Sequence, residues 1–203
     1  MAQPFSMIRA FHLADWFTLA NAMCGTGAIF AIMEYNGSNQ VKHVYIACIL
    51  VCLALVFDIL DGHIARWRQN ASALGRELDS LSDMISFGIV PAMIGFSIGM
   101  QGLWDRLALA YFIACGVSRL ARYNLTAAAI VGPNEKVRQF EGTPIPTSLL
   151  LVLLLTIAAA KDAVGSGIWF GELSIMDQKL HPFVLLFVLF GSLMISRIPI
   201  PKP

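Results

Sequence analysis

Four aspartates lie close together in a stretch of the chain whose surroundings are apolar. Asp58, Asp61, Asp79 and Asp83 all belong to the segment DILDGHIARWRQNASALGRELDSLSD, residues 58–83. Carboxylates without histidine or cysteine at ligand spacing are typical oxygen ligands for Mg²⁺ or Mn²⁺, and four of them could hold two ions. Two closely spaced cations can bind a diphosphate and stabilise both the attacking and the leaving oxygen of a phosphoryl displacement. The residue types therefore indicate metal-assisted phosphoryl chemistry.

The spacing of the aspartates predicts how they are held. The first two are three residues apart and the last two are four apart, so each pair shares one face of a helix. The mostly polar residues 66–78 separate the pairs and allow an antiparallel turn, after which both acidic faces can point at one another. Ionised carboxylates in that arrangement would repel one another strongly at membrane depth, so cations are expected between them.

The elements that must position these aspartates are membrane helices. Of the 203 residues, 57% are hydrophobic and only 13% are charged. Six apolar runs are long enough to be considered as spans, and they cover residues 16–33, 44–65, 80–100, 104–126, 146–164 and 180–197. Sustained alternation of apolar and polar residues is absent, so helices are the expected spanning form. We predict an all-α polytopic membrane protein with six transmembrane helices in a single domain, residues 1–203, and a short interfacial helix over residues 1–14.

The distribution of positive charge predicts the orientation in the membrane. With both termini on one side, ten of the 14 lysines and arginines collect on that side. Cytoplasmic loops carry such an excess, so both termini and the aspartates are predicted to face the cytoplasm. The net charge is only +1, which gives no indication of nucleic-acid binding. Because neither a cleaved signal peptide nor an added soluble domain is recognised, we expect a multi-pass protein of a prokaryotic cell membrane.

The aspartates also belong to a longer pattern. The chain contains Asp-x2-Asp-Gly-x2-Ala-Arg-x8-Gly-x3-Asp-x3-Asp without a departure, and this resembles the signature of the CDP-alcohol phosphatidyltransferase family. The resemblance implies a six-helix membrane domain in which the hydroxyl of an alcohol displaces CMP from a CDP-linked lipid. It also implies that the first three aspartates bind the metals, that Asp83 both supports the metals and acts as the general base, and that the protein forms a homodimer.

The small and basic residues of the pattern form the candidate binding site for the CDP-linked lipid. Gly62, Ala65 and Gly75 leave space in which a nucleotide could approach the backbone, although small residues in membrane helices also mark close packing. Arg66, at the end of its helix, could meet phosphate oxygens. Asn21, near the start of the first span, touches the nucleotide or its ribose by resemblance, or else hydrogen-bonds to a neighbouring helix.

Three further segments bear on the acceptor alcohol. GRELDSLSDMISFGIVPA, SRLARYN and FEGTPIP resemble segments typical of the membrane-embedded phosphatidylserine synthases of this family. They favour CDP-diacylglycerol as the donor and L-serine as the acceptor, which gives phosphatidylserine and CMP. An arginine could bind the carboxylate of serine, or could only anchor its helix at an anionic membrane surface. The candidate residues for binding the acceptor or a phosphate are Arg119, Arg122, Tyr123, Arg138, Ser82 and Ser86.

Other interpretations of the sequence stay open. Glycerol 3-phosphate or inositol phosphate could be the acceptor, because these alcohols also need arginines, and an archaeal ether-linked lipid could be the donor. Acidic residues in membrane helices can also form the ion site of a transporter. A transporter would favour internal duplication and acids near mid-membrane, and the sequence shows neither. The four cysteines fall in apolar runs and are interpreted as packing residues.

Overall fold

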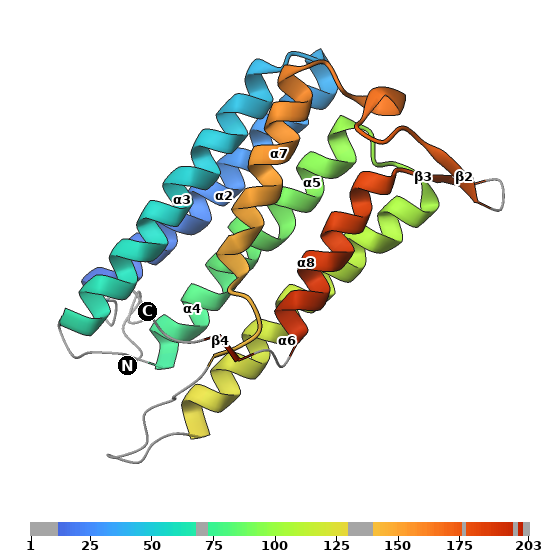
Figure 1. Cartoon of the computed structure of the whole chain (residues 1–203). Coiled ribbons are helices and arrows are strands. Elements are labelled where there is room, and N and C mark those ends of the chain that lie inside the picture. The colour runs from blue at the N-terminus through green and yellow to red at the C-terminus, as the bar shows by residue number, and fades with distance from the viewer. Residues whose placement is uncertain (1–11, 68–72, 130–139, 176–177, 197–198, 201–203) are drawn as a thin grey trace, which may run out of the picture.

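The structure, a computed structural model, is a bundle of long helices whose axes run in roughly the same direction (Figure 1). It describes residues 12–67, 73–129, 140–175, 178–196 and 199–200. Almost all of the interfacial helix predicted for residues 1–14 therefore lies outside the described residues. The part of the chain that is described is mostly helical, as the composition predicted.

Helical segments follow all six apolar runs of the sequence. Within the described residues they are α2 (Leu13–Ser38), α3 (Lys42–Trp67), the continuous run of α4 (Ala73–Asp83), η1 (Met84–Ile89) and α5 (Val90–Ile98), then α6 (Leu103–Ala129), α7 (Leu149–Ala160) and α8 (Leu185–Ile195). Short 3₁₀ turns, η2 (Ile145–Ser148) and η4 (Pro182–Val184), lead into α7 and α8, and η3 (Gly165–Gly167) lies between them.

Three of the helical segments are long and apolar enough to cross a membrane. They cover Leu13–Ser38, Lys42–Ile64 and Leu74–Ile98, while Ile145–Ala160 and Pro182–Ile195 are apolar but shorter. Large apolar side chains on α2 and α3 point outward, among them Met23 and Ile49, which are 74% and 60% exposed. Such an outer surface suits lipid rather than water, so the chain is a membrane protein, and the number of crossings stays a prediction.

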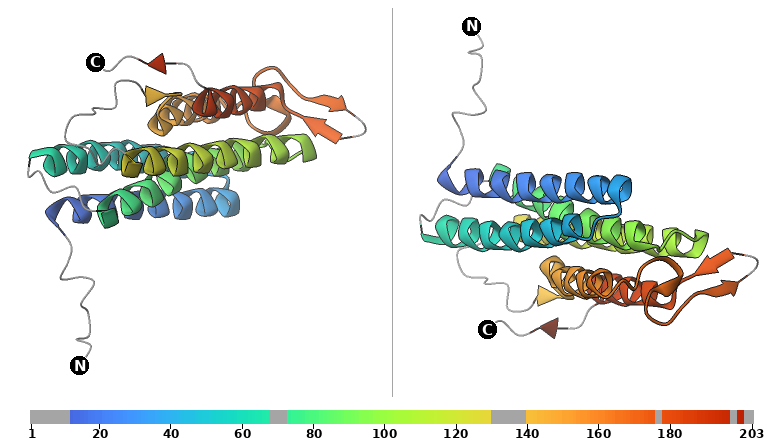
Figure 2. Two further views of the ribbon diagram at one scale, coloured as in Figure 1. Left: turned by 90° about the horizontal axis from the view of Figure 1, so that it is seen from below. Right: turned by 90° about the horizontal axis from the view of Figure 1, so that it is seen from above.

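The helices are stacked in layers (Figure 2). α2 lies on one side of the bundle, α7 and α8 lie on the opposite side, and α3 and α6 run between them. α2 and α3 pack against each other along their length, and α6 packs against α8. The rings of Phe112 on α6 and Phe187 on α8 meet edge to face with their centroids 5.3 Å apart. The helices that carry the aspartates, α3 and α4, both pack against α2.

Two short strand pairs were not part of the all-α prediction. β1 (Phe140–Glu141) pairs antiparallel with β4 (Pro199–Ile200), and β2 (Leu173–Ile175) pairs with β3 (Gln178–Leu180). Strands of two or three residues are too short to show an alternating pattern, and the sequence around them indicated only connections between helices. The β2–β3 hairpin extends from one end of the bundle (Figure 1).

A π-helix interrupts the third helical segment directly after Asp83. η1 separates α4 from α5, and Pro91 follows in the first turn of α5. Proline has no N–H group, so the carbonyl of Phe87 lacks its α-helical donor. The Ser148 hydroxyl, from η2, donates a hydrogen bond to that carbonyl at 2.6 Å. A contact from a distant segment thus stabilises the irregular backbone next to the acidic residues.

Candidate active site

Three of the four aspartates converge in the structure. Asp58 and Asp61 lie near the end of α3, Asp79 lies on α4, and one carboxylate oxygen of each is within 4.8 Å of the others. Asp61 is buried, and the other two are partly buried. The two acidic helix faces therefore point at one another, which is the arrangement that the residue spacing predicted.

Asp83 lies one helical turn beyond Asp79 and is buried, with 7% of its surface exposed. Its carboxyl group lies next to that of Asp58 and accepts a hydrogen bond from Nδ2 of Asn21 at 3.2 Å. The fourth aspartate thus adjoins the cluster of three from the bundle interior. Its roles as a metal ligand and as the base stay predictions.

α2 supplies a hydrogen bond to the cluster from a residue that sequence reasoning missed. The Thr18 hydroxyl donates to Oδ2 of Asp61 at 2.7 Å, and the Thr18 carbonyl accepts from the Ser82 hydroxyl at 2.9 Å. Thr18 is buried and lies three residues before Asn21, on the same face of α2. The three-residue spacing is visible in the sequence. The role of Thr18 can be inferred from it only when α2 is known to pack against α3 and α4.

Asn21 and Ser86 join α2 to the π-helix. Asn21 is completely buried, and its Oδ1 accepts a hydrogen bond from the Ser86 hydroxyl at 2.7 Å. Its amide nitrogen therefore points at Asp83, which fixes the orientation of the side chain. A Cβ atom at Gly25 would overlap Ser86, so the glycine allows the close approach of α2 to η1. In this structure Asn21, Ser82 and Ser86 all bond to neighbouring helices, and their contact with nucleotide or acceptor stays a prediction.

The donor set fits a divalent cation. Within the described residues, no lysine or arginine nitrogen lies within 4.0 Å of these carboxylates. Oδ1 of Asp79 is buried and has no hydrogen-bond partner in the described part of the chain. An oxygen in that state has lost its contact with water without gaining a donor, which is unfavourable unless a ligand binds it. Cations between the carboxylates would remove both this cost and the mutual repulsion.

Open space adjoins the cluster at Gly62. Among the described residues, a Cβ atom built on this residue would meet no atom of another segment within 4 Å. Gly62 follows Asp61 directly, so the space lies beside the candidate metal ligands. Gly75, on α4, is partly buried. The side chains of Ala65 and Arg66 lie outside the described part of the structure, and so does Arg138.

The comparison with known families decides what kind of protein carries this site. The sequence model of the CDP-alcohol phosphatidyltransferase family matches residues 11–194, which include every aspartate of the cluster. The chain belongs to this family. The transporter interpretation is thereby replaced by an enzyme interpretation, because the family model covers nearly all of the bundle.

Individual relatives of this CDP-alcohol phosphatidyltransferase come from all domains of life. A CDP-diacylglycerol–serine O-phosphatidyltransferase of Saccharomyces cerevisiae is 40% identical over 98% of this chain and 74% of its own length. A protein of the same name from Helicobacter pylori is 32% identical over 92% of this chain and 70% of its own length. An archaetidylserine synthase of Methanothermobacter thermautotrophicus is 34% identical over 69% of this chain and 55% of its own length.

Three of the residues predicted to bind the acceptor alcohol of this phosphatidyltransferase lie on α6. Arg119 is half-buried, its Nε has no hydrogen-bond partner among the described residues, and it lies close enough to Asp83 for electrostatic attraction. Arg122 and Tyr123 are exposed. Asn124, which the sequence reasoning did not single out, accepts from Ser80 and donates to Glu77 on α4, each at 3.2 Å. The structure therefore brings Arg119 toward the cluster and leaves Arg122 at the surface.

Proposed function

We propose that the chain transfers the phosphatidyl group of CDP-diacylglycerol to the hydroxyl of L-serine, giving phosphatidylserine and CMP. The observation that carries this proposal is the convergence of the family's aspartates beside open space at Gly62. The names of the relatives from yeast and Helicobacter support serine as the acceptor. The sequence segments that resemble phosphatidylserine synthases support the same acceptor and CDP-diacylglycerol as the donor.

We infer that the cluster holds two Mg²⁺ or Mn²⁺ ions. The ligands would be Asp58, Asp61, Asp79 and Asp83, with the buried Oδ1 of Asp79 as an oxygen that now lacks a partner. Such ions supply charge stabilisation to the diphosphate and to the departing CMP. The ordered hydrogen bonds from α2 to Asp61 and Asp83 hold two of the ligands in place before any ion binds.

Asp83 is the proposed general base. The serine hydroxyl loses its proton to the Asp83 carboxylate while its oxygen forms a bond to the lipid phosphorus, and the bond from phosphorus to the CMP oxygen breaks. No covalent intermediate with the protein is needed. Asn21 orients the base because its Nδ2 donates to Asp83 and its Oδ1 is fixed by Ser86. The donor is uncharged, so it orients Asp83 without forming an ion pair with it.

Arg119 is the proposed partner of the serine carboxylate. A guanidinium that is half-buried without a carboxylate partner favours binding of an anion. Its position near Asp83 supports this proposal, because an amino acid bound there would have its carboxylate on α6 and its hydroxyl toward the base. Arg122, Tyr123, Arg138, Ser82 and Ser86 remain weaker candidates, because the described ones are at the surface or bonded to α2.

The nucleotide would lie at the open side of the cluster. Gly62 offers space for it, and we propose that Ala65 and Gly75 extend this space and that Arg66 meets phosphate oxygens. Acyl chains of the donor would then pass between helices into lipid. We also propose that the site faces the cytoplasm, that the membrane is that of a prokaryotic cell, and that the protein is a homodimer.

A panel of acceptor alcohols tests the proposed reaction. Purified protein is incubated with CDP-diacylglycerol, Mn²⁺ or Mg²⁺, and either L-serine, glycerol 3-phosphate or inositol phosphate, and CMP release is measured. We expect metal-dependent release with L-serine. Release with another alcohol alone would contradict the serine assignment, and no release with any alcohol would contradict the transferase proposal.

Substitution of the base separates chemistry from binding. We expect Asp83→Asn to lower turnover by about two orders of magnitude or more, because general-base catalysis contributes about 10²–10⁴-fold. Binding of CDP-diacylglycerol, measured by equilibrium dialysis, should change little. Normal turnover of this variant would show that another group accepts the proton.

An ether-linked donor is a second candidate, favoured by the archaetidylserine synthase among the relatives. The same assay with CDP-archaeol in place of CDP-diacylglycerol distinguishes the two. We expect the higher kcat/KM with CDP-diacylglycerol. A clear preference for CDP-archaeol would reassign the donor while leaving the cluster and its chemistry unchanged.

A further inference from the structure

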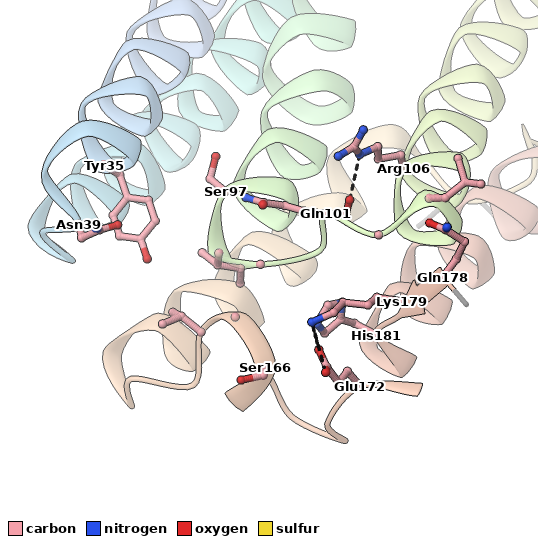
Figure 3. A pocket seen from close by; sticks show the side chains of 16 residues that line it. Tyr35, Asn39, Ser97, Gln101, Arg106, Ser166, Glu172, Gln178, Lys179 and His181 are labelled. Carbon is pink, nitrogen blue, oxygen red and sulfur yellow. Dashed lines mark hydrogen bonds and ion pairs between the residues drawn. The ribbon is translucent and has the colours of Figure 1, made fainter. Parts of the chain in front are cut away.

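A polar cavity of about 700 Å³ lies at the end of the bundle opposite the acidic cluster. It is lined by the ends of α2 and α5, the start of α6, η3 and the β2–β3 hairpin (Figure 3). Along α2, Tyr35 at the cavity follows Asn21 at the active site by 14 residues, which is roughly 20 Å of helix. The cavity is therefore distinct from the active site and lies toward the other side of the membrane.

A buried ion pair builds one wall of this cavity. Nδ1 of His181 lies 2.7 Å from Oδ2 of Asp105, and Oδ1 of Asp105 accepts a hydrogen bond from the backbone N–H of His181 at 2.8 Å. The two side chains are 3% and 0% exposed. Oδ2 of Asp105 also accepts from the backbone N–H of Gly102 at 3.1 Å. The pair thereby ties the start of α6 to the residue that follows β3.

Close backbone contact makes the same wall rigid. A Cβ atom at Gly102 would overlap the carbonyl group of Lys179, and one at Gly99 would come within 2.6 Å of the backbone of Gly165. Only glycine allows these approaches. The cavity is thus preformed by segments that are far apart in the sequence, and it is independent of the proposed chemistry at the other end.

One polar atom on this wall has no partner. Nε2 of His181 is buried and makes no hydrogen bond within the described part of the chain. Nδ1 faces the Asp105 carboxylate, so Nε2 is the ring nitrogen left for a further hydrogen bond. A buried polar atom without a hydrogen-bond partner is unfavourable, so a ligand that brings a hydroxyl group, which can both donate and accept, would be stabilised here.

The cavity also carries an excess of positive charge. Nε of Arg106 donates to the carbonyl of Gln101 at 2.9 Å, and the guanidinium lies 5.8 Å from the centre of the Phe96 ring. No carboxylate lies within 4.0 Å of Arg106 among the described residues, so its terminal nitrogens can meet an anion. The other cation, Lys179, is paired with Glu172 at 3.0 Å. Arg106 therefore supplies the unpaired charge.

We propose that this cavity binds a phosphate-bearing polar group, with its phosphate at Arg106 and a hydroxyl group at Nε2 of His181. A phospholipid head group and a free phosphodiester share this chemistry. Near the start of α6, Nε1 of Trp104 donates to the Ile175 carbonyl of the hairpin. Tryptophan side chains concentrate at the membrane interface, which is the depth of a head group in the leaflet opposite the active site.

Hydrogen–deuterium exchange of the full-length purified chain tests this proposal at the site itself. The probes are dihexanoyl phosphatidylglycerol and, separately, glycerophosphoglycerol, which is the same head group without acyl chains. Either probe should slow exchange in peptides that cover the start of α6 and the β2–β3 hairpin. Protection by the lipid alone identifies a lipid site, and protection by both identifies a site for the free phosphodiester as well. Protection confined to residues 58–83, or no protection, would overturn the proposal.

Matched variants locate the anion contact. We expect Arg106→Gln to raise the probe concentration for half-maximal protection at least about tenfold, because it removes charged hydrogen bonds to the phosphate. Lys161→Gln removes an exposed cation at the same end of the bundle but outside the cavity lining, and it should change nothing. Should Arg106→Gln fail to fold, Arg106→Lys serves, because it keeps the charge but loses the planar fork. Equal behaviour of the Arg106 and Lys161 variants would contradict the assigned contact.

Discussion

Asp61 and Asp83 each accept a hydrogen bond from α2, from Thr18 and Asn21 respectively. Each of these donors bonds to one oxygen of the carboxylate, Oδ2 of Asp61 and Oδ1 of Asp83. A donor of this kind fixes a carboxylate without neutralising it, which is how neighbouring side chains commonly tune metal ligands. At the scale of single residues, α2 therefore positions the chemistry that α3 and α4 carry.

Thr18→Val tests this positioning. The substitution keeps the shape of the side chain but removes the hydrogen bond to Asp61, so we expect Mn²⁺ affinity to fall by about 10- to 100-fold. Mn²⁺ binding is measured by electron paramagnetic resonance, independently of turnover. Thr26→Val is the matched control, because within the described part of the chain the Thr26 hydroxyl bonds to the Ala22 carbonyl of its own helix and not to the cluster. Equal affinities of the two variants would show that Thr18 does not hold Asp61.

Gly62→Leu tests the space beside the cluster. Because a Cβ atom at Gly62 meets no atom within 4 Å, the protein should fold with an unchanged or higher thermal midpoint, since leucine favours helix more than glycine does. The KM for CDP-diacylglycerol should rise on the order of tenfold, by crowding of the nucleotide. Gly37→Leu places the same side chain in open space at the far end of α2. An unchanged KM in the Gly62 variant would mean that the nucleotide lies elsewhere.

The sequence predicted the aspartates more completely than the residues around them. Spacings of three and four residues suffice to place Asp58 with Asp61 and Asp79 with Asp83, because helical periodicity is local. Thr18 lies more than 40 positions before its partner, so its role depends on tertiary packing. Asn21 was expected either at the nucleotide or against a neighbouring helix, and the described contacts are with neighbouring helices.

At the scale of elements, the break between α4 and α5 is the feature that periodicity could not show. An apolar run over residues 80–100 predicted one continuous helix, and the structure contains a π-helix at Met84–Ile89. The cause is a combination of Pro91 with a hydroxyl from another segment, Ser148, which the sequence does not link. The short strands were not predicted either. β1 pairs with β4, which only the tertiary structure brings beside it, and β2 and β3 are too short to show an alternating pattern.

Ser148→Ala tests whether the Ser148 hydroxyl stabilises the π-helix between α4 and α5. The substitution removes the Ser148 donor from the buried Phe87 carbonyl, so we expect the free energy of unfolding to fall by about 1–3 kcal/mol. Unfolding is followed by circular dichroism in mixed micelles with increasing dodecyl sulfate. Thr156→Ala is the control, because it removes only a bond to the Val152 carbonyl within α7. A loss of stability no larger than in the control would contradict the assigned support.

At the scale of the whole molecule, the bundle has two chemically different ends. One end carries the acidic cluster, and the other carries the polar cavity and the β2–β3 hairpin. Composition and apolar runs predicted the helical membrane fold because burial in lipid requires long apolar helices. The cavity was unpredictable, since residues from five separate segments build it.

Cysteine labelling tests the predicted orientation of these ends. In a variant whose native cysteines are replaced by alanine, Ser38→Cys at the end of α2 and Thr126→Cys near the end of α6 provide exposed reporters at opposite ends. A membrane-impermeant maleimide should label Ser38→Cys in intact bacterial cells, and Thr126→Cys only after the cells are opened. The reverse pattern would place the acidic cluster outside the cytoplasm.

The central claim is that the acidic cluster holds the divalent cations at which CMP is displaced. Equilibrium dialysis of the purified chain with Mn²⁺ and CDP-diacylglycerol measures this most directly, as the number of ions bound per chain. We predict two ions for the natural chain and a loss of tight binding in the double variant Asp61→Asn/Asp79→Asn. Equal binding by the two proteins, or no binding by the natural chain, would contradict the account.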